Sequence, residues 1–117
     1  MTPAVAYTYP ATLVRVIDGD TAVLVIDLGF NVSTTQHVRF LGYNAPELHG
    51  KNASRAQAAK AELENLLAGR KLIVKTSKDF IQTFARYLAE VWVADQTGWA
   101  DVARWMQSKG FDVRQGE

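Results

Sequence analysis

Three short segments in the first 41 residues are rich in apolar and β-branched side chains, and turn residues separate them. This pattern predicts three β-strands, over residues 11–17, 21–27 and 36–41. The tight turn Asp18-Gly19-Asp20 joins the first two, whereas a longer connection over residues 28–35 contains Gly29 and Asn31. Consecutive strands joined in this way favour an antiparallel meander.

The apolar residues change to a helical spacing after Ser54. Ser54 and Gln57 have the spacing of a capping box, and Gly69 supplies a C-terminal stop. The expected buried face of this helix consists of Ala56, Ala59, Leu63, Leu66 and Leu67. Beyond it, the pattern predicts strands over residues 71–76 and 87–93, then a second helix from near Trp99 to just before Gly110.

The predicted order is therefore three strands, a helix, two strands and a helix. This order is typical of an α+β, mainly β fold: a five-stranded OB-fold barrel with one helix between strands three and four and a second helix at the C-terminus. Residues 1–10 contain Pro3 and Pro10 and are predicted to form an N-terminal arm. Residues 11–117 are enough for one domain.

Composition narrows the classes of protein and site. The chain has 117 residues, of which 48% are hydrophobic and 21% charged, the balance of a globular protein. It has no cysteine, which excludes disulfides, thiolate zinc sites and cysteine nucleophiles. No apolar run reaches the ~20 residues of a membrane span, and no signal peptide is visible. We expect a monomer without a membrane partner, cytoplasmic unless a leader has been removed.

The net charge of +1 hides an uneven distribution. From Arg39 to Arg86 the chain holds nine basic and four acidic residues, and acidic residues exceed basic ones on both sides of this segment. A basic middle segment attracts a polyanion such as nucleic acid, but it is equally compatible with a solvated surface. Charge alone does not decide between these interpretations.

Candidate chemistry gathers at one end of the predicted meander. In the Asp18–Thr21 turn the carboxylates are either solvated or turned inward to bind a hard cation. Arg39 is either a solvated strand residue or a donor of paired hydrogen bonds to phosphate. In the loop that follows, Pro46 restrains Asn44-Ala45-Pro46-Glu47, and Arg86 precedes the fifth predicted strand. Two guanidinium groups near two or three oxygen ligands indicate a phosphodiester site.

The order and spacing of five segments resemble those of the staphylococcal nuclease (thermonuclease) family. The resemblance spans residues 11–111 and rests on Val16-Ile-Asp-Gly-Asp-Thr21, Val38-Arg-Phe-Leu-Gly-Tyr-Asn-Ala-Pro-Glu47, Ala58-Ala-Lys60, Leu66-Leu-Ala-Gly69 and Phe84-Ala-Arg-Tyr-Leu-Ala89. It implies an OB barrel that hydrolyses phosphodiester bonds of DNA and RNA with calcium. Family members cut on the 5′ side of the phosphate and leave 3′-phosphate ends.

The resemblance also implies roles by position. Asp20 matches a calcium ligand, Asn44 falls where the family has a second ligand aspartate, and the backbone carbonyl of Ala45 would complete the set. Glu47 matches the residue that orients or deprotonates the attacking water. Arg39 and Arg86 match the arginines that clamp the phosphate of a single-stranded DNA or RNA substrate, with Phe84 close to the nucleotide.

Departures from the family pattern leave alternatives open. Asn44 lacks a charge, Phe84-Ala85-Arg86 replaces Tyr-Gly-Arg, and the C-terminal helix and tyrosine pair that cover the nucleotide are missing. A module that binds nucleic acid without cutting it, or a protein-interaction domain on the same fold, is therefore the alternative to a nuclease. Trp92, Trp99 and Trp105 are interpreted as core residues rather than base-stacking ones.

Overall fold

The computed structural model describes residues 2–47, 53–76, 81–83 and 86–113, and every structural statement below concerns these. Seven strands and two helices follow one another as β1 (Thr8–Asp18), β2 (Thr21–Gly29), β3 (Val32–Phe40), α1 (Ala53–Leu67), β4 (Leu72–Lys75), β5 (Ile81–Thr83), β6 (Arg86–Asp95), β7 (Gly98–Asp101) and α2 (Val102–Ser108). None of these helices is long and apolar enough to span a membrane.

Five of the strands close into a barrel. β1 pairs with β2 and β4, β2 with β3, and β4 with β6, all antiparallel. Parallel pairing of β3 with β6 closes the ring, while β5 and β7 each pair with β6 outside it. Helix α1 connects the third barrel strand to the fourth, which confirms the expected OB-like arrangement with mainly β structure.

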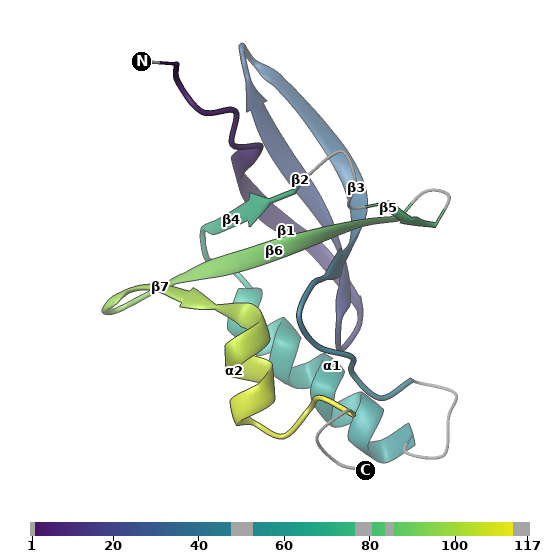
Figure 1. Ribbon diagram of the computed structural model, residues 1–117. Coiled ribbons are helices and arrows are strands. Elements are labelled where there is room, and N and C mark those ends of the chain that lie inside the picture. Colours follow the sequence, from purple (N-terminus) through teal and green to yellow (C-terminus); the bar gives the residue numbers. More distant parts are fainter. Residues whose placement is uncertain (1, 48–52, 77–80, 84–85, 114–117) are drawn as a thin grey trace.

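Both helices lie at one end of the barrel, and the β2–β3 hairpin projects from the opposite end (Figure 1). α1 buries the predicted face, consisting of Ala56, Ala59, Leu63, Leu66 and Leu67. α2 contributes Val102 and Met106 to the same core, which is otherwise filled by inward-facing strand residues such as Leu24 and Phe40. The core therefore holds the β1–β2 turn and the end of β3 close to the helices.

Several predicted boundaries were wrong. β1 begins inside the predicted arm, where Thr8 pairs with Lys75, because the φ angle that Pro10 imposes is compatible with an extended strand. Residues 28–35 are no long connection: β2 and β3 continue to a two-residue turn, Phe30-Asn31, with φ angles of 56° and 60°.

The C-terminal elements also differ from the prediction. Residues 98–101 form β7, and α2 begins only at Val102, because the Asp101 carboxylate caps it by accepting from the N–H groups of Ala103 and Arg104. Trp99 is 50% exposed and is not a core residue. Trp92 and Trp105 are half-buried, and Trp105 packs against the core. The short β5 was not predicted.

Candidate functional site

The Asp20 carboxylate is turned into the protein at the β1–β2 turn. The residue is only 7% exposed. Thr21 Oγ1 donates to Asp20 Oδ1 at 3.1 Å, and the Ala45 backbone N–H donates to Oδ2 at 3.0 Å. These bonds tie the turn to residues 42–47, the Asn44 loop, which follows β3. Asp20 therefore faces inward, as the second of the two interpretations of the turn requires.

Arg39 brings Asp20 and Asn44 together. Its Nη2 donates to Asn44 Oδ1 at 2.6 Å and lies 3.7 Å from Asp20 Oδ2. Arg39 reaches the turn because it pairs with Thr21 across the β2–β3 ladder. Its side chain is 25% exposed, and it borders a cleft of about 260 Å³ that is also lined by Gly42, Asn44 and Leu88. Three of the predicted site residues thus form one cluster next to a solvent-accessible cleft.

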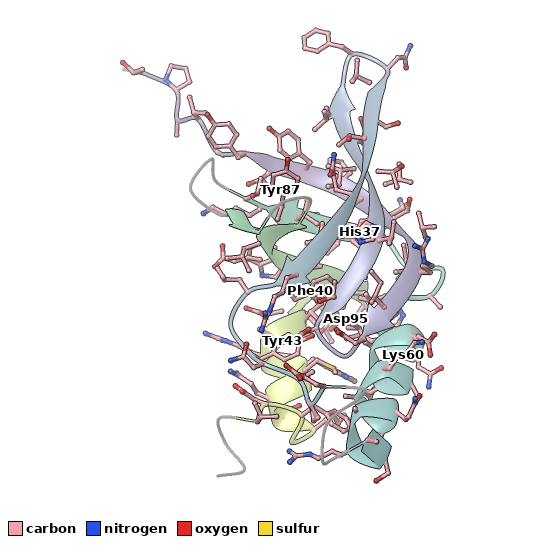
Figure 2. The ribbon with its side chains drawn as sticks, turned by 90° about the vertical axis from the view of Figure 1, so that its right-hand side faces the viewer. His37, Phe40, Tyr43, Lys60, Tyr87 and Asp95 are labelled. Carbon is pink, nitrogen blue, oxygen red and sulfur yellow. The ribbon has the colours of Figure 1, made fainter. Side chains whose placement is uncertain are left out.

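Gly19 permits the close approach of the turn to the loop and to α1. A Cβ atom at this position would lie 2.7 Å from the Cβ atoms of both Ala45 and Ala59, which is far too close. On the same side, the buried Tyr43 hydroxyl donates to the Gly19 carbonyl at 2.7 Å. Figure 2 shows Tyr43 at the helical end of the barrel, with Tyr87 towards the other end. The glycine of the turn is therefore a packing requirement of the site.

The segment after α2 holds the Asn44 loop. Asp112 Oδ1 accepts from the Asn44 backbone N–H at 3.3 Å, and the Val113 N–H donates to the Asn44 carbonyl at 2.8 Å. Gln107 Nε2 donates to the Gly42 carbonyl at 2.9 Å and to Asp112 Oδ2 at 3.3 Å. Asp112 is 2% exposed. Sequence reasoning missed Asp112 and Gln107, since neither belongs to a motif; an acidic residue directly after the apolar Phe111 was the only available signal.

Burial determines the electrostatics of the cluster. It raises the pKa of Asp20 to about 6, and a hydrogen bond with the Asp18 side chain adds to this effect, whereas the Ala45 N–H and the Arg39 charge oppose it. Burial also raises the pKa of Tyr43 well above its usual value, and the charges of Asp20, Asp18 and Asp112 raise it further. Three carboxylates therefore act on one buried hydroxyl, and Arg39 is the positive charge that lies against one of them, Asp20.

The other predicted site residues either make no polar contact in the described part of the chain or have side chains that the structure does not describe. Glu47 is exposed, and no hydrogen bond or ion pair to it is found in the described part of the chain. Arg86 lies opposite His37 in the parallel β3–β6 ladder, two positions before the partner of Arg39, so the register brings its backbone near Arg39. The Arg86 side chain and Phe84 lie outside what the structure describes.

The oxygen atoms of Asp20 and Asn44 are of the kind that binds a hard divalent cation. The Asp20 carboxylate and the Asn44 amide oxygen both lie against the Arg39 guanidinium, and oxygen atoms are the ligands that calcium takes. A cation there would offset the cost of burying the Asp20 charge. Among the described residues, however, no three His, Cys, Asp or Glu side chains are grouped closely enough to hold a metal on their own. Backbone carbonyls, water or a ligand phosphate would have to complete the coordination.

No protein-family model and no curated protein matches the chain. The function therefore has to be argued from the motifs of the sequence and from the geometry of the cluster around Asp20, Arg39 and Asn44.

Proposed function

We propose that this chain is a metal-dependent nuclease that uses calcium to hydrolyse phosphodiester bonds of single-stranded DNA or RNA, as in the staphylococcal nuclease family. The observation that carries the proposal is the contact of one arginine, Arg39, with a buried carboxylate and an amide oxygen beside an open cleft. A buried, ionisable carboxylate reduces stability, and such positions are typical of sites where the charge has a use. Cation binding gives Asp20 such a use.

In the proposed site, Arg39 and Arg86 hold the phosphate. A guanidinium has five N–H donors, and the bond of Arg39 to Asn44 uses one of them, so donors remain for two phosphate oxygens. Arg86, from the adjacent strand β6, is proposed to hold the same phosphate. Both charges would stabilise the negative charge that develops on the phosphoryl oxygens as the bond breaks.

Asp20, Asn44 and the Ala45 carbonyl are proposed to hold the cation, which when bound would neutralise phosphate charge and polarise the P–O bonds. Glu47 is proposed as the general base. It would accept a proton from the water that attacks phosphorus, while the bond from phosphorus to the 5′ oxygen breaks. The 5′ oxygen would take a proton from solvent and leave as a hydroxyl, and the other fragment would keep a 3′-phosphate. Its exposed position gives water free access to the carboxylate.

The test is cleavage of end-labelled single-stranded DNA and RNA with calcium, and again with excess chelator. We expect fragments with 3′-phosphate ends in calcium alone. Arg39→Lys is the matched control, because it keeps the charge but loses the paired hydrogen bonds, so its cleavage should fall; a contaminating nuclease would not respond to this change. No cleavage with any divalent cation, at micromolar protein and alkaline pH, would exclude the enzyme.

A second candidate function is supported by the β2–β3 hairpin tip. Leu28, Phe30 and Val32 are all substantially exposed there, and Phe30 is fully so. Exposed apolar side chains gathered at one place favour a protein contact, as expected for an interaction domain. Such a domain would need no nucleic-acid affinity, so the cleavage and binding assays distinguish the two functions. A catalytically inactive binding module would instead bind single strands without cutting them.

A further inference from the structure

The carboxylate of Asp112 lies on the backbone side of Asn44, the residue that departs from the family pattern. It accepts from the backbone N–H of Asn44, while the next residue, Val113, donates to the Asn44 carbonyl. Both backbone groups of Asn44 are thus held by residues that follow α2. The side chain of Asn44 then points to Arg39, at 2.6 Å from its Nη2.

Other contacts anchor the segment that carries Asp112. Gln107 in α2 donates to Asp112 Oδ2 and to the Gly42 carbonyl, and Arg55 in α1 donates to the Gly110 carbonyl. The segment is therefore attached to both helices and to the loop. Asp112 is held at a fixed position relative to Asn44 and is almost fully shielded from solvent.

A fixed, buried carboxylate at this position has an electrostatic consequence. Asn44 contributes an oxygen to the proposed cation site but no charge, which leaves Asp20 as the only charged side chain among the proposed ligands. Asp112 is not one of those ligands, yet its carboxylate bonds to the backbone of one. Charges that are shielded from solvent act on neighbouring groups with little screening by water or salt.

We propose that Asp112 is a positioning residue of the cation site, which holds Asn44 in place and supplies from behind it the negative charge that Asn44 lacks. The inference rests on the proposed function, since it assigns Asp112 a role toward the same cation. Residues outside a ligand set commonly change metal affinity by ~10–100-fold.

Asp112→Asn tests the charge, because asparagine keeps the size of the side chain and an oxygen that accepts from the Asn44 N–H. Calcium affinity, measured calorimetrically, should fall about tenfold. In chelator, the affinity for a nucleoside 3′,5′-bisphosphate should rise, because a negative charge near the phosphate site has been removed. The opposite signs are decisive, since a damaged site would bind both ligands more weakly.

Three further variants complete the design. Asp27→Asn removes an exposed charge at the far end of the barrel and should change neither affinity. Asn44→Asp combined with Asp112→Asn should restore calcium binding, because one charge returns beside the site. Gln107→Met keeps the Asp112 charge but removes the hydrogen bonds that Gln107 donates to Asp112 Oδ2 and to the Gly42 carbonyl. Because Asp112 still accepts from the Asn44 N–H, this variant should bind calcium nearly as wild type does.

The outcomes separate this inference from the proposed function. If the wild-type chain binds calcium and the bisphosphate but Asp112→Asn leaves both affinities unchanged, or weakens both, the role of Asp112 is overturned and the nuclease proposal stands. If Gln107→Met weakens calcium binding tenfold, the hydrogen bonds of Gln107 rather than the Asp112 charge determine the calcium affinity. The proposed role of the charge is then overturned, even where Asp112→Asn fails to fold. A wild-type chain that binds neither ligand overturns both proposals.

Discussion

At the scale of single residues, the unusual feature is the loss of stability that comes from burying the Asp20 carboxylate. Its carboxyl is buried against Ala45 and Thr21, and its pKa is raised to about 6 from 3.8. This difference corresponds to ~3 kcal/mol of unfolding free energy. Ionised Asp20 therefore reduces the stability of the fold, although the proposed function needs its charge.

Asp20→Asn should therefore stabilise the chain in the absence of divalent cations. Below about pH 4 the carboxyl is protonated in both the folded and the unfolded state. Between about pH 4 and 6 only the folded chain retains the proton, so the free energy of unfolding falls as the pH rises, and above about pH 6 the loss is complete.

Urea unfolding at pH 4 and pH 8 measures this effect. The variant should be about 1–3 kcal/mol more stable than wild type at pH 8 and nearly equal at pH 4. Asp27→Asn, at an exposed carboxylate, is the control and should show no such difference. Equal stability of Asp20→Asn and wild type at pH 8 would show that the Asp20 charge is well accommodated.

Glu47→Gln addresses the proposed general base. Because Glu47 is exposed and makes no polar contact in the described part of the chain, the variant should keep the wild-type unfolding midpoint. Its turnover should fall by ~10²–10⁴-fold, the usual contribution of a general base. Single-turnover cleavage and thermal unfolding of the same preparation measure both quantities. If Glu47→Gln keeps the wild-type turnover, the general base is another residue.

The sequence predicted only part of the cluster. Asp20, Arg39 and Asn44 stand at or just beyond strand ends that a meander brings together, and the Thr21–Arg39 pairing shows this directly. Asp112 was not predictable in this way, because its contact with Asn44 joins positions 68 residues apart and follows no repeating pattern. Periodicity reports on neighbours within one element and says little about such a contact.

At the scale of elements, the turns were harder to predict than the strands and helices between them. Phe30 and Asn31 form a tight turn with left-handed backbone conformations, but an exposed phenylalanine there does not look like a turn residue. The Trp99 region was likewise assigned to a helix, although Asp101 caps α2 only from Val102 onward. In these cases one or two residues decided a boundary against the surrounding hydrophobic pattern.

Gly19→Ala should disrupt the packing of two elements without straining the backbone of the turn itself. Its Cβ would overlap the Cβ atoms of Ala45 and Ala59, neither of which can rotate away, so the β1–β2 turn must separate from α1 and from the Asn44 loop. We expect a loss of about 1–3 kcal/mol in unfolding free energy, together with weaker calcium binding.

Chemical denaturation and calorimetry measure these two effects. Ala58→Ser, on the exposed side of α1, is the control and should change stability by less than about 0.5 kcal/mol. If Gly19→Ala is as stable as wild type, the turn does not pack against α1 as described.

At the scale of the whole molecule, the element order was sufficient to predict a barrel but not all of its strands. The predicted meander, helix and two further strands are present, and the parallel β3–β6 pairing closes them into a ring. β5 and β7 were not predicted because they are short and pair only with β6, outside the ring. The three residues of β5 leave too little alternation to be recognised, and β7 runs directly into α2, so its residues were assigned to the helix.

Phe30→Asn tests whether the hairpin tip serves an interaction. The side chain buries nothing, and asparagine suits the left-handed conformation, so the unfolding free energy should stay within about 0.5 kcal/mol of wild type or rise slightly. A monomeric nuclease should show the same mass by light scattering and the same cleavage rate for both proteins. A lower mass for the variant would reveal self-association through the tip.

The attachment of Asn44 to residues 112 and 113 also fixes a sequence of events during synthesis. A ribosome makes Asp20, Arg39 and Asn44 well before it makes the residues that hold both backbone groups of Asn44. A nascent chain can therefore pair Arg39 with Thr21 early, but both backbone groups of Asn44 find their partners only after residue 113 has been added. If the chain is the nuclease proposed above, the messenger RNA under translation does not meet a finished cutting site on the protein it encodes until residue 113 has been made.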